Sequence, residues 1–146
     1  MSPIQNQDHN QALDIAYILQ HYRKVAVVGL SPKPERDSHE VAHYMQAQGW
    51  TIIPVNPMAS AAPILGQKVY ASLLEAAQHE QIDVVCCFRN SVDIPPIATE
   101  AIQIGAKALW MQLGIEHPGA AEQARLAGLR VVQDKCLLIE QSRRQG

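Results

Sequence analysis

The chain has 146 residues, of which 47% are hydrophobic and 18% charged, and its formal net charge is −2. This length and balance are typical of one globular domain with a single core, and they argue against a disordered chain. The small net charge gives no general attraction for nucleic acid, and no apolar run is long enough to span a membrane.

The cysteines and the N-terminus indicate a cellular compartment. The chain has three cysteines, an odd number, and two of them, Cys86 and Cys87, are adjacent. The first ten residues are polar and lack the basic and apolar regions of a signal peptide. We therefore predict a cytoplasmic protein with reduced thiols rather than a disulfide framework.

Short apolar runs alternate with helical patterns along the whole chain. After a flexible segment of about residues 1–8, the first half predicts a helix over 8–21, a strand over 24–29, a helix over 38–48 capped by Ser38, and a strand over 50–55. The second half predicts an edge strand over 67–70, strands over 82–88, 108–111 and 129–132, and helices over 72–78, 95–104, 117–127 and 135–143. This alternation predicts an α/β, Rossmann-like fold, in which one domain over residues 1–146 forms an open, mainly parallel sheet with helices on both faces.

The loop between the first expected strand and the next helix has the composition of an anion site. Gly29 ends the strand, and Ser31, Lys33 and Arg36 follow before the helix begins. In such units ligands bind beyond the carboxyl end of the strand, where backbone N–H groups and a helix N-terminus favour anions. The hydroxyl and the two cations therefore predict a phosphate-binding loop. The alternative is that these are solvated surface charges, offset by Glu35 and Asp37.

Two features count against a nicotinamide cofactor at this loop. The usual dinucleotide fingerprint has three glycines, and only Gly29 is present here. The second strand ends in Val55-Asn56-Pro57, without the acidic residue that accepts a hydrogen bond from the ribose of NAD. This strand end offers instead an apolar edge and an amide that can hydrogen-bond a base or ribose.

Six motifs follow one another along the chain: GLSPKPERDS (29–38), IPVNP (53–57), LG (65–66), DVVCCFR (83–89), ALWMQLG (108–114) and VVQDKC (131–136). In this order they resemble the CoA-binding-domain protein family over about residues 20–142. Members of that family are small, stand-alone relatives of the nucleotide-binding domain in the α-subunit of succinyl-CoA synthetase. The resemblance implies a Rossmann-type fold that holds coenzyme A along the carboxyl edge of its sheet.

The resemblance also implies which residues contact the ligand. Gly29, Leu30 and Ser31 would lie against the diphosphate, and Lys33 and Arg36 would face the phosphates, including the 3′-phosphate. Ser38 would cap the helix and donate to a phosphate. The remaining contacts implied are an adenosine wall, formed by Pro54, Val55, Asn56 and Pro57, and a path for the diphosphate and the pantetheine arm, formed by Phe88, Arg89 and Gln112.

No catalytic residue and no metal site is predicted. His39 and His43 are spaced to share one helix face, but no third metal ligand stands near them and a solvated face is the simpler interpretation. Cys86 and Cys87 lie in an expected strand, where cysteine acts as a small apolar side chain. Cys136 begins the last expected helix, whose N-terminus favours a thiolate that could exchange with the thiol of CoA, although a structural role is the simpler interpretation.

The sequence thus favours a non-catalytic module that binds coenzyme A or an acyl-CoA. One alternative is a small NAD(P)-dependent oxidoreductase or an acyl-CoA ligase subunit with the same fold. A second alternative is a protein–protein adaptor with a vestigial nucleotide site, whose partner the sequence does not identify.

Overall fold

The computed structural model describes residues 3–59 and 61–145, and its strands form one parallel sheet. These strands are β1 (Lys24–Val28), β2 (Thr51–Val55), β3 (Val84–Cys87), β4 (Ala108–Met111) and β5 (Arg130–Val132). Their order across the sheet is β2-β1-β3-β4-β5. The neighbours β1 and β3 lead to helices on opposite faces, so their carboxyl ends border the crevice where open α/β sheets bind ligands.

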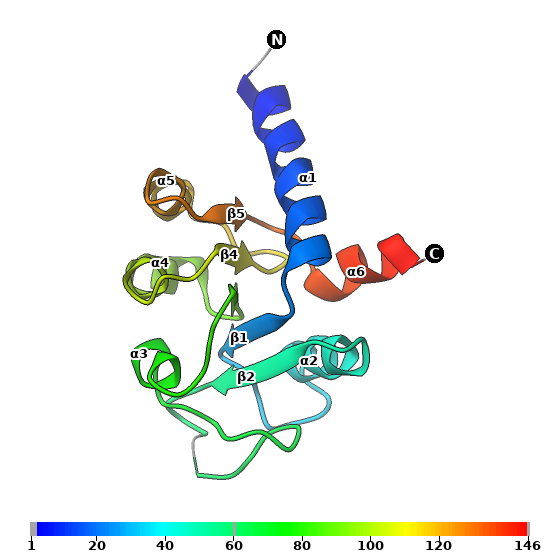
Figure 1. Ribbon diagram of the computed structural model, residues 1–146, viewed down its shortest axis with the longest axis vertical. Helices are drawn as coiled ribbons and strands as arrows, with labels where there is room; N and C mark the ends of the chain where they lie inside the picture. Colours follow the sequence, from blue (N-terminus) through cyan, green and yellow to red (C-terminus); the bar gives the residue numbers. More distant parts are fainter. Residues whose placement is uncertain (1–2, 60, 146) are drawn as a thin grey trace.

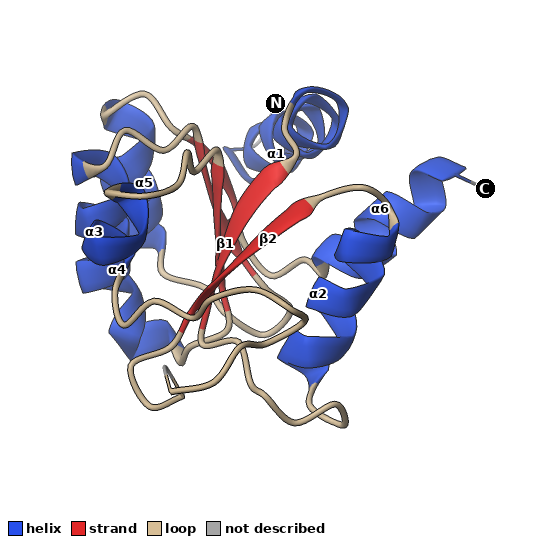
Figure 2. Ribbon diagram, turned by 60° about the horizontal axis from the view of Figure 1, so that its bottom comes forward, coloured by secondary structure: helices blue, strands red, loops and turns tan. Residues whose placement is uncertain are grey.

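Helices cover both faces of the sheet, as the sequence predicts (Figure 1). They are α1 (Pro3–His21), α2 (Asp37–Ala47), α3 (Leu73–Ala77), α4 (Ile94–Gln103), α5 (Pro118–Leu126) and α6 (Leu137–Gln145), with a 3₁₀ turn, η1 (Ser91–Asp93), before α4. Figure 2 shows α3, α4 and α5 on one side of the strands and α1, α2 and α6 on the other. In the part of the chain that is described, no helix is both long enough and apolar enough to cross a bilayer.

The burial of the strands on both faces explains their unbroken apolar runs. In β1 every residue after Lys24 is buried. Val25 and Val27 pack with α1, α2 and α6, whereas Ala26 and Val28 pack with α3, α4 and α5. Successive side chains of a strand point to opposite faces, so a strand between two helical layers has no polar face.

The structure corrects two expectations at helix starts. Helix α1 begins at Pro3, so residues 3–8, expected to be a flexible segment, are helical, and residues 1–2 lie outside the described residues. Helix α2 begins at Asp37 with Arg36 at the N-cap position, so Ser38 lies in the first turn and is not the cap. The chain enters α2 early because the Arg36 N–H already donates to the Lys33 carbonyl, at 3.1 Å.

The strand expected over residues 67–70 is also wrong. Tyr70 pairs with Val55 as an isolated parallel bridge, whereas Gln67 pairs backwards with Ile64 in a tight turn. Gln67, the first residue of the expected strand, belongs to that turn. Tyr70, its last residue, is the one that pairs with β2. Its position beside β2 is that of the third strand of a Rossmann fold, here reduced to one bridge.

Candidate functional site

Three neighbouring clefts follow the carboxyl edge of the sheet. The loop cleft, of about 610 Å³, is lined by Gly29, Ser31, Lys33, Glu35, Arg36, Asp37, Ser38 and Phe88. The β2 cleft, of about 390 Å³, shares Gly29 with it and adds Val55, Pro57, Ser72, Arg89 and Pro96, among others. The α6 cleft, of about 250 Å³, shares Asp37 and Phe88 with the loop cleft and extends to Gln112 and Cys136. A long ligand can therefore cross from one side of the sheet to the other at this edge.

Gly29 lies where β1, β2 and β3 converge. Its φ is +89°, and its N–H donates to the Val55 carbonyl at 2.8 Å. A Cβ at this position would come within 2.6 Å of the Phe88 carbonyl oxygen. Only glycine allows this close approach together with a left-handed backbone, so the sharp turn out of β1 depends on this residue.

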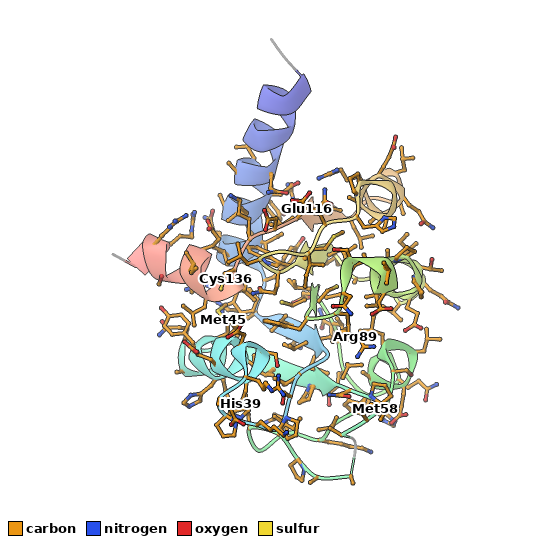
Figure 3. All side chains as sticks on the ribbon, turned by 180° about the vertical axis from the view of Figure 1, so that it is seen from behind. His39, Met45, Met58, Arg89, Glu116 and Cys136 are labelled. Carbon is orange, nitrogen blue, oxygen red and sulfur yellow. The ribbon has the colours of Figure 1, made fainter. Side chains whose placement is uncertain are left out.

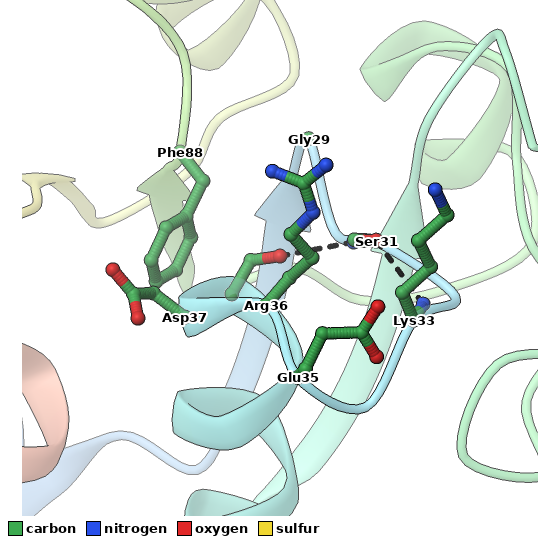
Figure 4. A pocket seen from close by; sticks show the side chains of 8 residues that line it. Gly29, Ser31, Lys33, Glu35, Arg36, Asp37 and Phe88 are labelled. Carbon is green, nitrogen blue, oxygen red and sulfur yellow. Dashed lines mark hydrogen bonds between the residues drawn. The ribbon is translucent and has the colours of Figure 1, made fainter.

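Two serines fix the shape of the loop after Gly29. The Ser31 N–H donates to the Ser38 hydroxyl oxygen at 3.0 Å, and the Lys33 N–H donates to the Ser31 hydroxyl oxygen at 3.1 Å (Figure 4). Ser38 is only 5% exposed, so it anchors the loop from inside the first turn of α2. The Ser31 N–H, expected to face a diphosphate, is thus already bonded within the protein, while both hydroxyls can still donate a proton to a ligand.

The N-terminus of α2 opens into the loop cleft. Arg36 occupies its N-cap position and makes no side-chain capping bond. The first N–H groups of the helix therefore donate to no N-cap side chain. In Figure 4 the guanidinium of Arg36 lies beside Gly29, whereas the side chain of Lys33 extends on the other side of the loop. Their charges are formally balanced by Glu35 and Asp37, which line the same cleft. Attraction for an anion at this site must therefore come from the local direction of the cations and the helix dipole, rather than from net charge.

Asn56 has a different task from the one its sequence position suggests. Its amide nitrogen donates to the Leu30 carbonyl at 2.9 Å, and its amide oxygen accepts from the Met58 N–H at 2.9 Å. The side chain thus ties the exit of β2 to the exit of β1 instead of standing free to bond a base or ribose.

The other residues expected to wall an adenosine are divided between core and cleft. Val55 and Pro57 line the β2 cleft, whereas Pro54 is buried within β2 and is not part of the lining of that cleft. A proline is tolerated there because β2 is an edge strand of the five-stranded sheet. The side chain of Leu30 is likewise fully buried, so this residue can offer a ligand only its backbone.

Phe88 and Arg89 diverge at the exit of β3. Phe88 is half-buried and lines both the loop cleft and the α6 cleft. Arg89 lines the β2 cleft, where its guanidinium lies 3.9 Å from the Asp93 carboxylate, with both side chains more than 40% exposed. Exposed pairs of this kind contribute little to stability, so Arg89 is available to a ligand.

Gln112 lines the α6 cleft and is 4% exposed. Its amide oxygen accepts from the Leu137 N–H at 2.9 Å and from the Cys86 thiol at 3.5 Å. The side chain therefore caps the start of α6 from β4, a tertiary contact that sequence alone does not reveal.

The described titratable groups include two buried thiols and a pair of neighbouring histidines. Burial raises the pKa of Cys87 to about 12 and that of Cys86 well above its ordinary value, so both thiols stay protonated in the core. The His39 and His43 rings lie 6.4 Å apart. Across residues 3–59 and 61–145, no group of three or more His, Cys, Asp or Glu side chains is placed to hold a metal ion.

Most of the predicted site residues lie at the carboxyl edge of the sheet. The structure adds a group of apolar residues in the α6 cleft that the sequence did not indicate. The α6 cleft is lined by Leu113, Ile115, Leu138 and Ile139 beside Cys136. These apolar residues come from two segments about 25 positions apart, and nothing in either segment distinguishes cleft lining from core.

The fold defines an α/β domain of the Rossmann type. A family model described as "CoA binding domain" matches residues 23–142. The protein YneT of Bacillus subtilis is 39% identical over 126 residues, which cover 86% of this chain and 90% of YneT. The chain therefore belongs to the CoA binding domain family.

Solved structures agree with this assignment. A protein from Pyrococcus horikoshii OT3 is 37% identical, with a TM-score of 0.84 and 92% of each chain covered. A protein from Thermus thermophilus is 31% identical, with a TM-score of 0.83, and the match covers 92% of this chain and 97% of the other. Biliverdin reductase from Synechocystis, solved with NADP+, is only 15% identical, with a TM-score of 0.58. The match covers 76% of this chain and 37% of the reductase, and it shows a shared fold alone.

Proposed function

We propose that the protein binds coenzyme A, free or as an acyl thioester, as a binding module rather than as an enzyme. The observation that carries this proposal is the loop cleft, where Lys33, Arg36 and the open N-terminus of α2 meet beside Gly29. Its setting in a chain of the CoA binding domain family supports the choice of ligand. The free thiols support a cytoplasmic location as part of the same proposal.

Each cleft suits one part of the ligand. In the loop cleft the diphosphate lies along Gly29, the Leu30 backbone and the Ser31 hydroxyl, and the Ser38 hydroxyl donates to a phosphate oxygen. Lys33 and Arg36 face the phosphates, including the 3′-phosphate. In the β2 cleft Val55 and Pro57 wall the adenosine, and Asn56 holds the two loops together. The arm then passes Phe88 toward Gln112, and Arg89 remains on the nucleotide side.

The contacts of Asn56 argue against the oxidoreductase alternative. A bound NAD needs an acceptor for its ribose at the end of β2. The residue there is an amide whose two ends already bond Leu30 and Met58. This site is therefore poorly suited to NAD.

Calorimetric titration with CoA, dephospho-CoA and NADH tests the proposal. We expect CoA to bind, and dephospho-CoA to bind about tenfold more weakly because it lacks one charge-assisted contact worth about 1–3 kcal/mol. Binding of NADH alone would favour the oxidoreductase. Binding of none of the three would favour an adaptor with a vestigial site.

A further inference from the structure

Cys136 differs from the other two thiols of the chain in its access to a cleft. Cys86 and Cys87 are 0% exposed, whereas Cys136 is half-buried and lines the α6 cleft. It directly precedes α6, and its carbonyl accepts the Glu140 N–H at 3.0 Å, so it occupies the N-cap position of that helix. Figure 3 shows Cys136 at the start of α6, on the side of the sheet away from Arg89.

The segment before Cys136 is held firmly against the exit of β4. The Gly114 N–H donates to the Asp134 carboxylate at 2.6 Å, and the Asp134 N–H donates to the Ile115 carbonyl at 3.1 Å. The indole N–H of Trp110 donates to the Lys135 carbonyl at 2.8 Å. The backbone at Cys136 therefore has a fixed place beside the cleft rather than the freedom of a surface loop.

A second group in the same cleft points independently to a ligand. Gln112 is 96% buried, since its exposed fraction is 4%, and its amide oxygen bonds the Leu137 N–H and the Cys86 thiol. Within the described residues its amide nitrogen has no hydrogen-bond partner. This nitrogen is not fully buried, so it borders the α6 cleft that the side chain lines and can donate to an acceptor from outside the protein. The pantetheine arm carries such an acceptor, because the nitrogen of its last amide lies two carbons from the sulfur and the carbonyl of that amide is the next group along the arm.

The α6 cleft also has the right neighbours for the end of that arm. It shares Phe88 and Asp37 with the loop cleft, so the two are adjacent. Apolar side chains, including Val41 and Leu138, line its walls. Asp37 and Glu40 bring negative charge to it, and the N-terminus of α6 brings a partial positive charge next to Cys136.

We propose that the α6 cleft receives the thiol end of CoA and that Cys136 forms a mixed disulfide with it. The oxidised reactant is the disulfide of CoA. The Cys136 thiol loses its proton to water, and its sulfur attacks one sulfur of the CoA disulfide. The bond between the two CoA sulfurs breaks as the bond to Cys136 forms, and the second CoA leaves as a thiolate that takes up a proton. This inference rests on the proposed function, because the nucleotide end must bind in the other clefts for the thiol end to be delivered here.

The test compares two disulfides on the wild-type protein by intact mass spectrometry. CoA disulfide carries the nucleotide, whereas pantethine, the disulfide of pantetheine, has the same reactive end without it. We expect an adduct of one CoA per chain that thiol reductant removes, with peptide mapping placing it on Cys136. Tethering by the nucleotide raises the local concentration of the disulfide, so the reaction with CoA disulfide should be at least about tenfold faster than with pantethine. The double variant Lys33→Ala/Arg36→Ala should lose most of that difference.

A parallel titration of reduced wild-type protein with CoA, in the presence of reductant, separates the two proposals. If CoA binds there but CoA disulfide leaves no adduct on Cys136, the inference is overturned and the proposed function stands. Equal rates with pantethine, or an adduct on Cys86 or Cys87, would also overturn it. If reduced CoA does not bind at all, the proposed function fails as well.

Discussion

Replacing Gly29 with alanine tests the convergence of β1 and β3 that positions the site. The substitution adds a Cβ to a residue with φ +89°, and that atom would lie 2.6 Å from the Phe88 carbonyl oxygen and 3.0 Å from the Arg89 side chain. A left-handed backbone costs a residue other than glycine about 1–2 kcal/mol. Relieving the contact with a backbone oxygen requires a shift of the chain, which costs about 1–3 kcal/mol more. We therefore expect the free energy of unfolding to fall by about 2–5 kcal/mol.

Gly49 is the matched control, because its φ is +95° and nothing lies within 4 Å of the Cβ it would gain. Gly49→Ala should show the backbone cost alone, about 1–2 kcal/mol. The assay is urea unfolding followed by tryptophan fluorescence, since Trp50 and Trp110 are 2% and 0% exposed. If both variants lose the same stability, the ends of β1 and β3 do not approach as closely as described, and the argument for Gly29 fails.

Three further predictions concern the ligand, the loops and the core. Arg36→Ala should weaken CoA binding by about 1–3 kcal/mol in calorimetry. The control is Arg125→Ala, which changes an exposed residue of α5 and should leave the affinity for CoA as it is. An unchanged dissociation constant in Arg36→Ala would remove Arg36 from the site. Asn56→Ala should lower the free energy of unfolding in urea by about 1–3 kcal/mol, because it removes two hydrogen bonds and leaves the Leu30 carbonyl without its amide partner. An unchanged free energy of unfolding would mean that these bonds do not hold the loops together. Burial raises the pKa of Cys87 to about 12 from 9.0, so the unfolded chain releases this proton first and stability falls as the pH rises above 9. The loss from this thiol should reach about 1.4 kcal/mol at pH 10, with a smaller slope in Cys87→Ala, and equal slopes in the two proteins would contradict the assignment.

The strands could be predicted because burial on both faces leaves a strong local signal. The runs at residues 25–28 and 84–87 are unbroken and apolar, and both are buried strands between helical layers. The start of α2 could not be predicted in the same way. A serine before periodic apolar residues fits an N-cap and a first-turn position equally well, and the hydrogen bond between Ser31 and Ser38 that decides between them depends on the loop conformation.

Which residues line the clefts could be predicted more fully than the contacts that each side chain makes. The charges after Gly29 indicated the loop cleft, because every one of them is local to a single strand–helix connection. The task of Asn56 and the contacts of Gln112 depend on residues 26 and 25 positions away, which sequence alone does not bring together. The α6 cleft joins residues from 37 to 139, so its existence follows from the order of the strands and not from any motif.

The central claim, that the carboxyl edge beside Gly29 binds coenzyme A, is tested most directly by the backbone amide signals of the 15N-labelled protein during titration with CoA. We predict that the largest shifts occur at the amides of Leu30, Asp37 and Ser38, with smaller ones along the β2 and α6 clefts. A separate polar cleft, of about 580 Å³ and lined in part by Glu122 and Arg125, lies at the carboxyl end of β5 and shares no lining residue with the loop cleft. Shifts confined to that cleft, with the amides after Gly29 unchanged at saturating CoA, would contradict the claim.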